Sequence, residues 1–270
     1  MDPSIVTVYV ILGGLVGTLL WVYVASYKGI AVSASHSLIG GFVGAALAKA
    51  GIESLKLGGV SKVLIFIIVA PLLGMIGGFL FFTLIMWIFR KVNPHKINKW
   101  FRRLQLISAS SYAITHGAND GQKTMGIIVL ILVSAGMLDE FEMPIWVIFA
   151  AATAMGLGTF FGGYKVIKTL GIKVTKLKPY QGFCAETGGG LMLAIFATLG
   201  IPASTTHAIT GTIMGAGAAR RKMAVRWKVG RQIVFAWVIT IPGAAGMAIG
   251  FAYLIHLFVS FLNTFIFISP

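Results

Sequence analysis

Ionisable side chains in an otherwise apolar segment, THGANDGQKTMG from Thr115 to Gly126, are the first candidates for chemistry. Asp120 and Lys123 lie three residues apart, so they share a helix face and can form an ion pair. Charges at membrane depth are costly and are functional candidates by default. The segment offers oxygen ligands for a small cation from Asn119 and Asp120, and donors for an anion from Gln122, Lys123 and Thr124. The alternative is a pair that only fixes helix packing.

A hydroxyl-rich turn is the second candidate, and it occurs twice. The stretch GIPASTTHAITG from Gly200 to Gly211 matches GIAVSASHSLIG from Gly29 to Gly40 at a constant offset of 171 residues. Ser and Thr after a Pro are typical of a helix N-terminus. A helix that begins at membrane depth points free N–H groups and its positive dipole end into the protein, where an oxyanion can bind. The alternative is plain capping of a buried helix.

Glu186, in FCAETGGG, is the third candidate. It is either a cation or proton ligand inside a hairpin, or an interfacial carboxylate near a basic loop. Enzyme signatures are absent, because the sequence has neither His-Glu-x-x-His nor Gly-x-Ser-x-Gly. A Ser204–His207 dyad for proteolysis would leave Asp120, Lys123 and the duplicated turn unexplained. The chain is therefore not expected to be an enzyme.

The composition indicates a membrane protein. Of 270 residues, 57% are hydrophobic and 11% are charged, against about 25% charged in soluble domains. This excludes a soluble enzyme, a disordered chain and a disulfide scaffold. The net charge is +15, and 17 of the 22 basic residues lie in segments 90–103, 165–178 and 220–231. That clustering is typical of cytoplasmic loops rather than of nucleic-acid binding, and it predicts a multi-pass protein of the inner membrane.

Charge-poor stretches predict an all-α fold of transmembrane helices, at about 5–27, 30–48, 63–89, 106–137, 144–164, 182–219 and 232–262. Two of these are too long for one plain helix and contain breakers at 116–121 and 199–202, which predicts broken helices or re-entrant hairpins. The acidic turn 138–143 belongs outside, so 182–219 must double back from the inside. If 5–48 also doubles back, it does so from the outside, and the two units form an inverted repeat, as in many secondary transporters.

Four stretches carry a resemblance to the inorganic phosphate transporter (PiT) family, bacterial type: HGANDGQKTMG at 116–126, GFCAE at 182–186, GIPASTTH at 200–207 and AVRW at 224–227. The resemblance implies symport of inorganic phosphate with Na⁺ or H⁺ by alternating access, with no cofactor beyond the coupling ion. The family's phosphate and cation sites lie between two inverted halves. Each half supplies an Asn-Asp helix and a Ser-Thr-Thr-His turn.

The resemblance implies a role for each candidate. The cation would contact Asn119 and Asp120, and Glu186 is a candidate cation or proton ligand. Phosphate would bind to Gln122, Lys123, Thr124, Ser204, Thr205 and Thr206, with Ser33 and Ser35 as partners from the first turn. Three histidines are secondary candidates: His36, His116 and His207.

The sequence departs from the family pattern in its first half. The family has two Asn-Asp motifs, and this chain has one, at 119–120. Ala31 replaces a usual Pro, and Ala34 stands opposite Thr205. We therefore expect residues 1–89 to be a remnant of the first repeat lacking one or two helices, followed by a basic cytoplasmic loop at 90–105 and the second repeat at 106–270. The chain could form a homodimer, need a complementing chain, be inactive in transport, or act as an anion channel.

Overall fold

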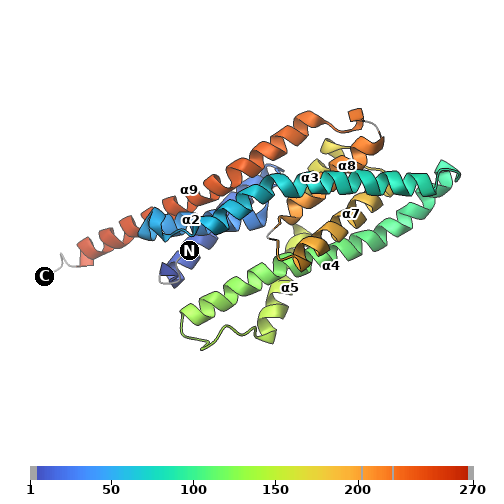
Figure 1. Cartoon of the computed structure of the whole chain (residues 1–270). Coiled ribbons are helices and arrows are strands. Elements are labelled where there is room, and N and C mark those ends of the chain that lie inside the picture. The colour runs from blue at the N-terminus through green and yellow to red at the C-terminus, as the bar shows by residue number, and fades with distance from the viewer. Residues whose placement is uncertain (1–4, 202, 221, 267–270) are drawn as a thin grey trace.

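The computed structural model describes residues 5–201, 203–220 and 222–266, which contain no β-strand. The main helices are α1 (Val8–Tyr27), α2 (Ala34–Ala50), α3 (Leu57–Ile88), α4 (Pro94–Ser134), α5 (Ile145–Phe161), α6 (Tyr164–Lys168), α7 (Pro179–Thr198), α8 (Thr205–Arg220) and α9 (Trp227–Ile266) (Figure 1). Short turns of other helix types are η2 (Ile52–Ser54), η3 (Thr169–Val174) and η4 (Lys222–Ala224). The predicted all-α fold is confirmed.

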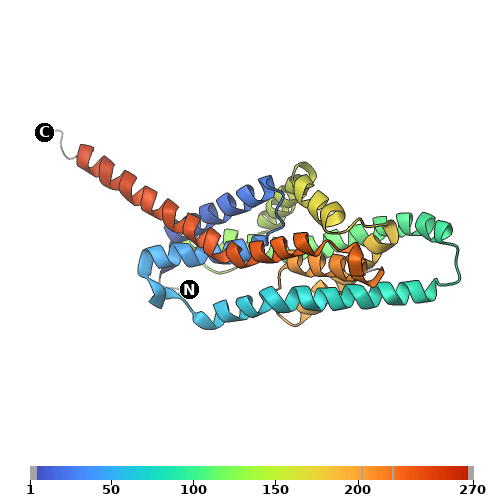
Figure 2. The same cartoon turned by 90° about the horizontal axis from the view of Figure 1, so that it is seen from above.

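Among the described residues, length and composition allow three helices to cross a membrane: α1, α3 from Gly58, and α9 as far as Phe258. A fourth span is possible if α5 and the segment 164–174, which meet at a bend of 59°, form one broken crossing. The final turns of α9 project beyond the other helices in both cartoon views (Figure 2).

Two helical hairpins form where the duplicated turns lie. The first is α1 and α2, and the second is α7 and α8, and they open toward opposite ends of the molecule (Figure 1). Each turn contains a glycine with positive φ, Gly29 at 69° and Gly200 at 63°, in the left-handed region that other residues rarely adopt. The predicted doubling back of 5–48 and 182–219 is confirmed. Pro202 lies outside the described residues.

The correspondence at an offset of 171 residues extends beyond the turns, and corresponding residues make corresponding packing contacts. Pro71 lies inside α3 and its counterpart Pro242 lies inside α9. The hairpins pack on the opposite repeat, because α2 contacts α9 and α8 contacts α3. Gly44 of α2 lies directly against the α9 backbone, and its counterpart Gly215 of α8 lies against the α3 backbone. Each hairpin therefore packs across onto the long helix of the other unit.

The predicted break at 116–121 is wrong. Helix α4 runs without interruption for 41 residues, through Gly117 and Gly121. A glycine in a helix costs only about 1 kcal/mol relative to alanine, and the pairs that Asp120 forms with His116 and Lys123 along the helix oppose that cost.

The loop predicted at 90–105 is wrong for most of its length. Asn93 caps α4 by accepting a hydrogen bond from the backbone of His95 (2.8 Å), with Pro94 at the first position of the helix. The basic residues that follow favour a helix, so they form the first turns of α4.

The basic segment 165–178 is also partly helical. It forms the end of α6 and η3 and packs on the turn of the first hairpin. Thr169 Oγ1 donates to the carbonyl of Gly29 (2.8 Å), and Lys165 Nζ donates to the carbonyl of Tyr27 (3.0 Å). These bonds satisfy carbonyls that the end of α1 leaves free, and they fix the first hairpin to the second half of the chain.

Candidate functional site

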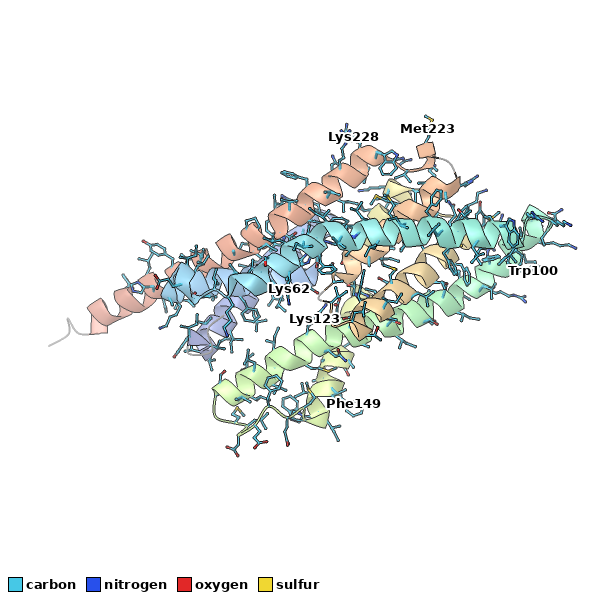
Figure 3. The ribbon with its side chains drawn as sticks, viewed as in Figure 1. Lys62, Trp100, Lys123, Phe149, Met223 and Lys228 are labelled. Atoms are coloured by element: carbon cyan, nitrogen blue, oxygen red, sulfur yellow. The ribbon has the colours of Figure 1, made fainter. Side chains whose placement is uncertain are left out.

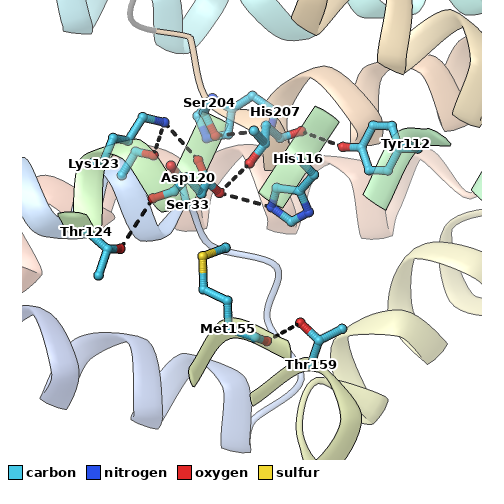
Figure 4. A network of polar contacts seen from close by, with 12 residues as sticks. Ser33, Tyr112, His116, Asp120, Lys123, Thr124, Met155, Thr159, Ser204 and His207 are labelled. Carbon is cyan, nitrogen blue, oxygen red and sulfur yellow. Dashed lines mark hydrogen bonds and ion pairs between the residues drawn. The ribbon is translucent and has the colours of Figure 1, made fainter. Parts of the chain in front are cut away.

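An ion pair on α4 joins the tips of the two hairpins (Figure 4). Lys123 Nζ lies 2.8 Å from Asp120 Oδ1 and also donates to Ser35 Oγ at 2.8 Å. Thr205 Oγ1 donates to Asp120 Oδ2 at 3.0 Å. Ser35 lies in the first turn of α2, and Thr205 begins α8. The predicted pair therefore forms, and it links the N-terminal ends of two helices from opposite repeats.

Two further α4 side chains complete this cluster. His116 Nε2 lies 2.9 Å from Asp120 Oδ2, and Tyr112 Oη donates to the carbonyl of Thr205 at 3.4 Å. The rings of Tyr112 and His116 are 5.8 Å apart. Residues three or four apart share one face of an α-helix. Because α4 is continuous, it aligns these side chains on one face.

The capping serines lie at the base of each turn. Ser33 Oγ accepts from the backbone N–H of His36 (3.1 Å), and Ser204 Oγ accepts from that of His207 (3.2 Å). Both serines are buried. These two oxygens therefore only cap helices, as the alternative interpretation expects. Ser35, two residues after Ser33, and Thr205, one residue after Ser204, bond to the ion pair instead.

The duplicated histidines meet between the hairpins. His36 and His207 are 1% and 0% exposed, and their rings contact edge to face with centroids 4.6 Å apart. The ring of His207 also stacks on Trp237 of α9 at 3.9 Å. The indole N–H of Trp237 donates to the carbonyl of Ala31 at 2.9 Å. These contacts make the histidines part of the packing at the crossing of the two hairpins.

Several predicted residues lie at the edge of the cluster. Gln122 and Thr124 are exposed on α4, and Thr124 Oγ1 bonds to the carbonyl of Asp120 in its own helix (3.3 Å). Asn119 and Thr206 are partly buried. None of these four side chains has a described hydrogen bond to another helix, so the structure does not bring them into the network.

Glu186 lies apart from Asp120. Its carboxylate accepts hydrogen bonds from Ser108 Oγ (2.6 Å) and Gln105 Nε2 (3.3 Å) of α4. Ser108 precedes Asp120 by twelve residues, which is about 18 Å along a helix. The structure therefore does not bring Glu186 and Asp120 together as ligands of one ion.

Sequence reasoning missed Tyr112, Ser108, Gln105 and Trp237. Tyr112 carried a usable signal, because it lies four residues before His116 and eight before Asp120 on a continuous helix. The other three depend on how α4 meets α7 and how α9 meets the first hairpin, and local spacing does not reveal those contacts.

The net charge of the cluster limits what it can bind. Asp120 and Lys123 neutralise each other, so an incoming phosphate adds uncompensated negative charge next to a carboxylate. Burying an unpaired charge is expensive.

Comparison with known proteins identifies the family of the chain. The profile described as "Phosphate transporter family" matches residues 1–97 and 89–248. A protein of Rhizobium meliloti (strain 1021) named "Probable low-affinity inorganic phosphate transporter" is 49% identical over 246 residues, 91% of this chain and 74% of that protein. One of the same name from Bacillus subtilis (strain 168) is 40% identical over 237 residues, 87% of this chain and 71% of its own length.

A solved structure described as "The sodium-dependent phosphate transporter" superposes with a TM-score of 0.84. It is 23% identical and matches 95% of this chain and 82% of its own, a similarity that supports the fold. The named relatives are transporters and not enzymes. On the extent of the profile match and the identity to these relatives, the chain belongs to the phosphate transporter family.

Proposed function

We propose that this chain binds inorganic phosphate and a coupling cation at the Asp120–Lys123 cluster and carries both across the inner membrane by alternating access. The observation that carries the proposal is the ion pair that reaches Ser35 in one repeat and Thr205 in the other. A site between two inverted units can be exposed to either side of the membrane when one unit moves against the other.

The helix ends strengthen the case for an oxyanion. The N-termini of α2 and α8 both point at the cluster, so their dipoles and first-turn N–H groups favour negative charge there. Lys123 supplies a full positive charge, and Ser35 and Thr205 supply hydroxyl donors. A tetrahedral phosphate needs donors on several sides, and this arrangement offers them from three separate helices.

The role of the cation follows from the charge balance. Asp120 already accepts from Lys123 and Thr205, which are the groups that phosphate needs. Na⁺ or H⁺ bound at the carboxylate would release both donors and offset one negative charge. Phosphate and cation would then bind better together than separately, which is the condition for coupled transport.

The test is phosphate uptake by the purified chain alone in proteoliposomes. Labelled phosphate is measured with an inward Na⁺ gradient, with a proton gradient, and with neither. We expect accumulation only with a gradient, and loss of at least 90% of it in Lys123→Met. Lys62→Met is the matched control, because Lys62 is an exposed α3 residue outside the cluster (Figure 3).

Other outcomes identify the alternatives. Equilibration without accumulation, whatever the gradient, would indicate an anion channel. No uptake by a folded, membrane-inserted chain would indicate an inactive remnant, or a subunit that needs a complementing chain or a second copy. Uptake by Lys123→Met equal to that of the control would refute the proposed site.

A further inference from the structure

A cavity of about 580 Å³ lies away from the cluster, where the end of α1, η3 and the start of α9 meet. Three basic residues line it, one from each of these elements: Lys28, Lys173 and Arg231. The remaining wall is largely apolar and includes Ile233, Phe235 and Ala236 of α9. The cavity therefore combines a cationic rim with a hydrocarbon-like wall.

The positive charge of this cavity has no acidic partner among the described residues. Of the seven Asp and Glu residues in the sequence, the six that the structure describes do not line the cavity. The ion pairs found in the described ranges are both formed by Asp120. The three basic side chains at the cavity are themselves exposed. Within the described part of the chain no acidic group balances these three charges, so the cavity suits an anion.

The charge pattern of the sequence places this cavity at one leaflet. Lys173 and Arg231 belong to two of the three basic segments that the positive-inside rule puts on the cytoplasmic side. The apolar side chains below them belong to α9, which is long and apolar enough to span the membrane. Phe235 is 66% exposed on that surface. The cavity thus faces the inner leaflet at the depth of the lipid headgroups.

We propose that this cavity binds an anionic phospholipid of the inner leaflet, with the headgroup phosphate held by Lys28, Lys173 and Arg231 and an acyl chain against α9. Basic pockets between transmembrane helices on the cytoplasmic side suit such headgroups. Free phosphate would use the rim but would gain nothing from the apolar wall, so the wall favours a lipid. A lipid here would also connect the first hairpin to α9, since the cavity wall includes both.

The test compares lipid retention by two double variants of the full chain. Lys173→Gln with Arg231→Gln removes two charges from the rim. Lys176→Gln with Lys228→Gln is the matched control, because it removes two exposed charges from the same two basic segments (Lys228 is labelled in Figure 3). Neither Lys176 nor Lys228 lines the cavity. Each protein is purified from membranes, checked for an unchanged thermal midpoint, and titrated with phosphatidylglycerol or phosphatidylcholine while bound lipid is counted by native mass spectrometry.

We expect the rim variant to bind phosphatidylglycerol about 30-fold more weakly than the control, since each of the two basic residues removed contributes about fivefold near a membrane. Phosphatidylcholine should bind weakly to both variants. Equal retention of phosphatidylglycerol by the rim variant and the control would overturn the proposal. A rim variant that keeps phosphatidylglycerol but loses binding of labelled inorganic phosphate would overturn it too, by showing a vestibule for the free ion.

Discussion

The Asp120–Lys123 pair can be tested as a thermodynamic unit, separately from its place in transport. The perturbations are Asp120→Asn, Lys123→Met and the double variant that carries both. Each single change leaves one charge of the pair in place: Lys123 with Ser35 alone, or Asp120 with His116 and Thr205. The double variant removes both charges and retains similar side-chain volumes.

The expected size follows from the exposure of the pair. Breaking a buried ion pair costs roughly 3–5 kcal/mol. Because 31% of the Lys123 side chain and 18% of the Asp120 side chain remain exposed, solvent reduces this cost, and we expect about 2 kcal/mol for each single variant. This corresponds to a fall of about 4–8 °C in the thermal midpoint. The double variant should lose only about 1 kcal/mol, which gives a coupling energy of about 3 kcal/mol.

The assay is thermal unfolding of the purified variants in detergent, paired with phosphate uptake in proteoliposomes. We expect the double variant to recover most of the thermal midpoint and none of the uptake. Two results would refute the reasoning. If the double variant transports phosphate as the unmodified chain does, the pair serves packing alone. If both single variants keep the original midpoint, the pair does not stabilise the contact between the hairpins.

Three other changes test the packing around the site by the same thermal midpoint. Gly215→Ala should destabilise the chain by about 1–3 kcal/mol, because the added methyl group overlaps the α3 backbone. Gly246→Ala is its control, because no atom lies within 4 Å of the added carbon. This variant should be neutral or should stabilise α9 by up to about 1 kcal/mol. Equal losses of stability in both variants would contradict the packing. Ser108→Ala should cost about 1.5 kcal/mol, because it removes the 2.6 Å hydrogen bond to the Glu186 carboxylate; an unchanged midpoint would mean that this bond does not hold α4 to α7. Trp237→Phe should cost about 1–3 kcal/mol, since a buried carbonyl at the first turn loses its donor, and a gain in stability would contradict that role.

The hairpins could be predicted because their signals are local. A glycine with positive φ and a capping serine three residues before a histidine fix each turn within a dozen residues. The repeat at an offset of 171 residues also extends to Pro71 and Pro242. That longer match was available in the sequence, and it indicates that α3 and α9 are counterparts.

The break predicted in α4 failed because glycine is a weak breaker inside a helix. Two glycines without a proline do not outweigh the pairs that Asp120 forms with His116 and Lys123. The separation of Glu186 from Asp120 has a different cause. Glu186 belongs to α7, and the level at which it meets α4 depends on how α7 packs along α4. Tertiary packing determines that register, and the local sequence does not encode it.

The crossed packing of the hairpins has a consequence for biosynthesis. Gly44 rests on α9 at Ala245, about 200 residues further along the chain. At 5–20 residues per second, the ribosome needs about 10–40 s to deliver that partner. Until then the glycine-lined side of α2 has only lipid or the translocation machinery against it, whereas α8 finds α3 already inserted when it emerges. The second hairpin can therefore dock during synthesis, and the first must wait for the last helix.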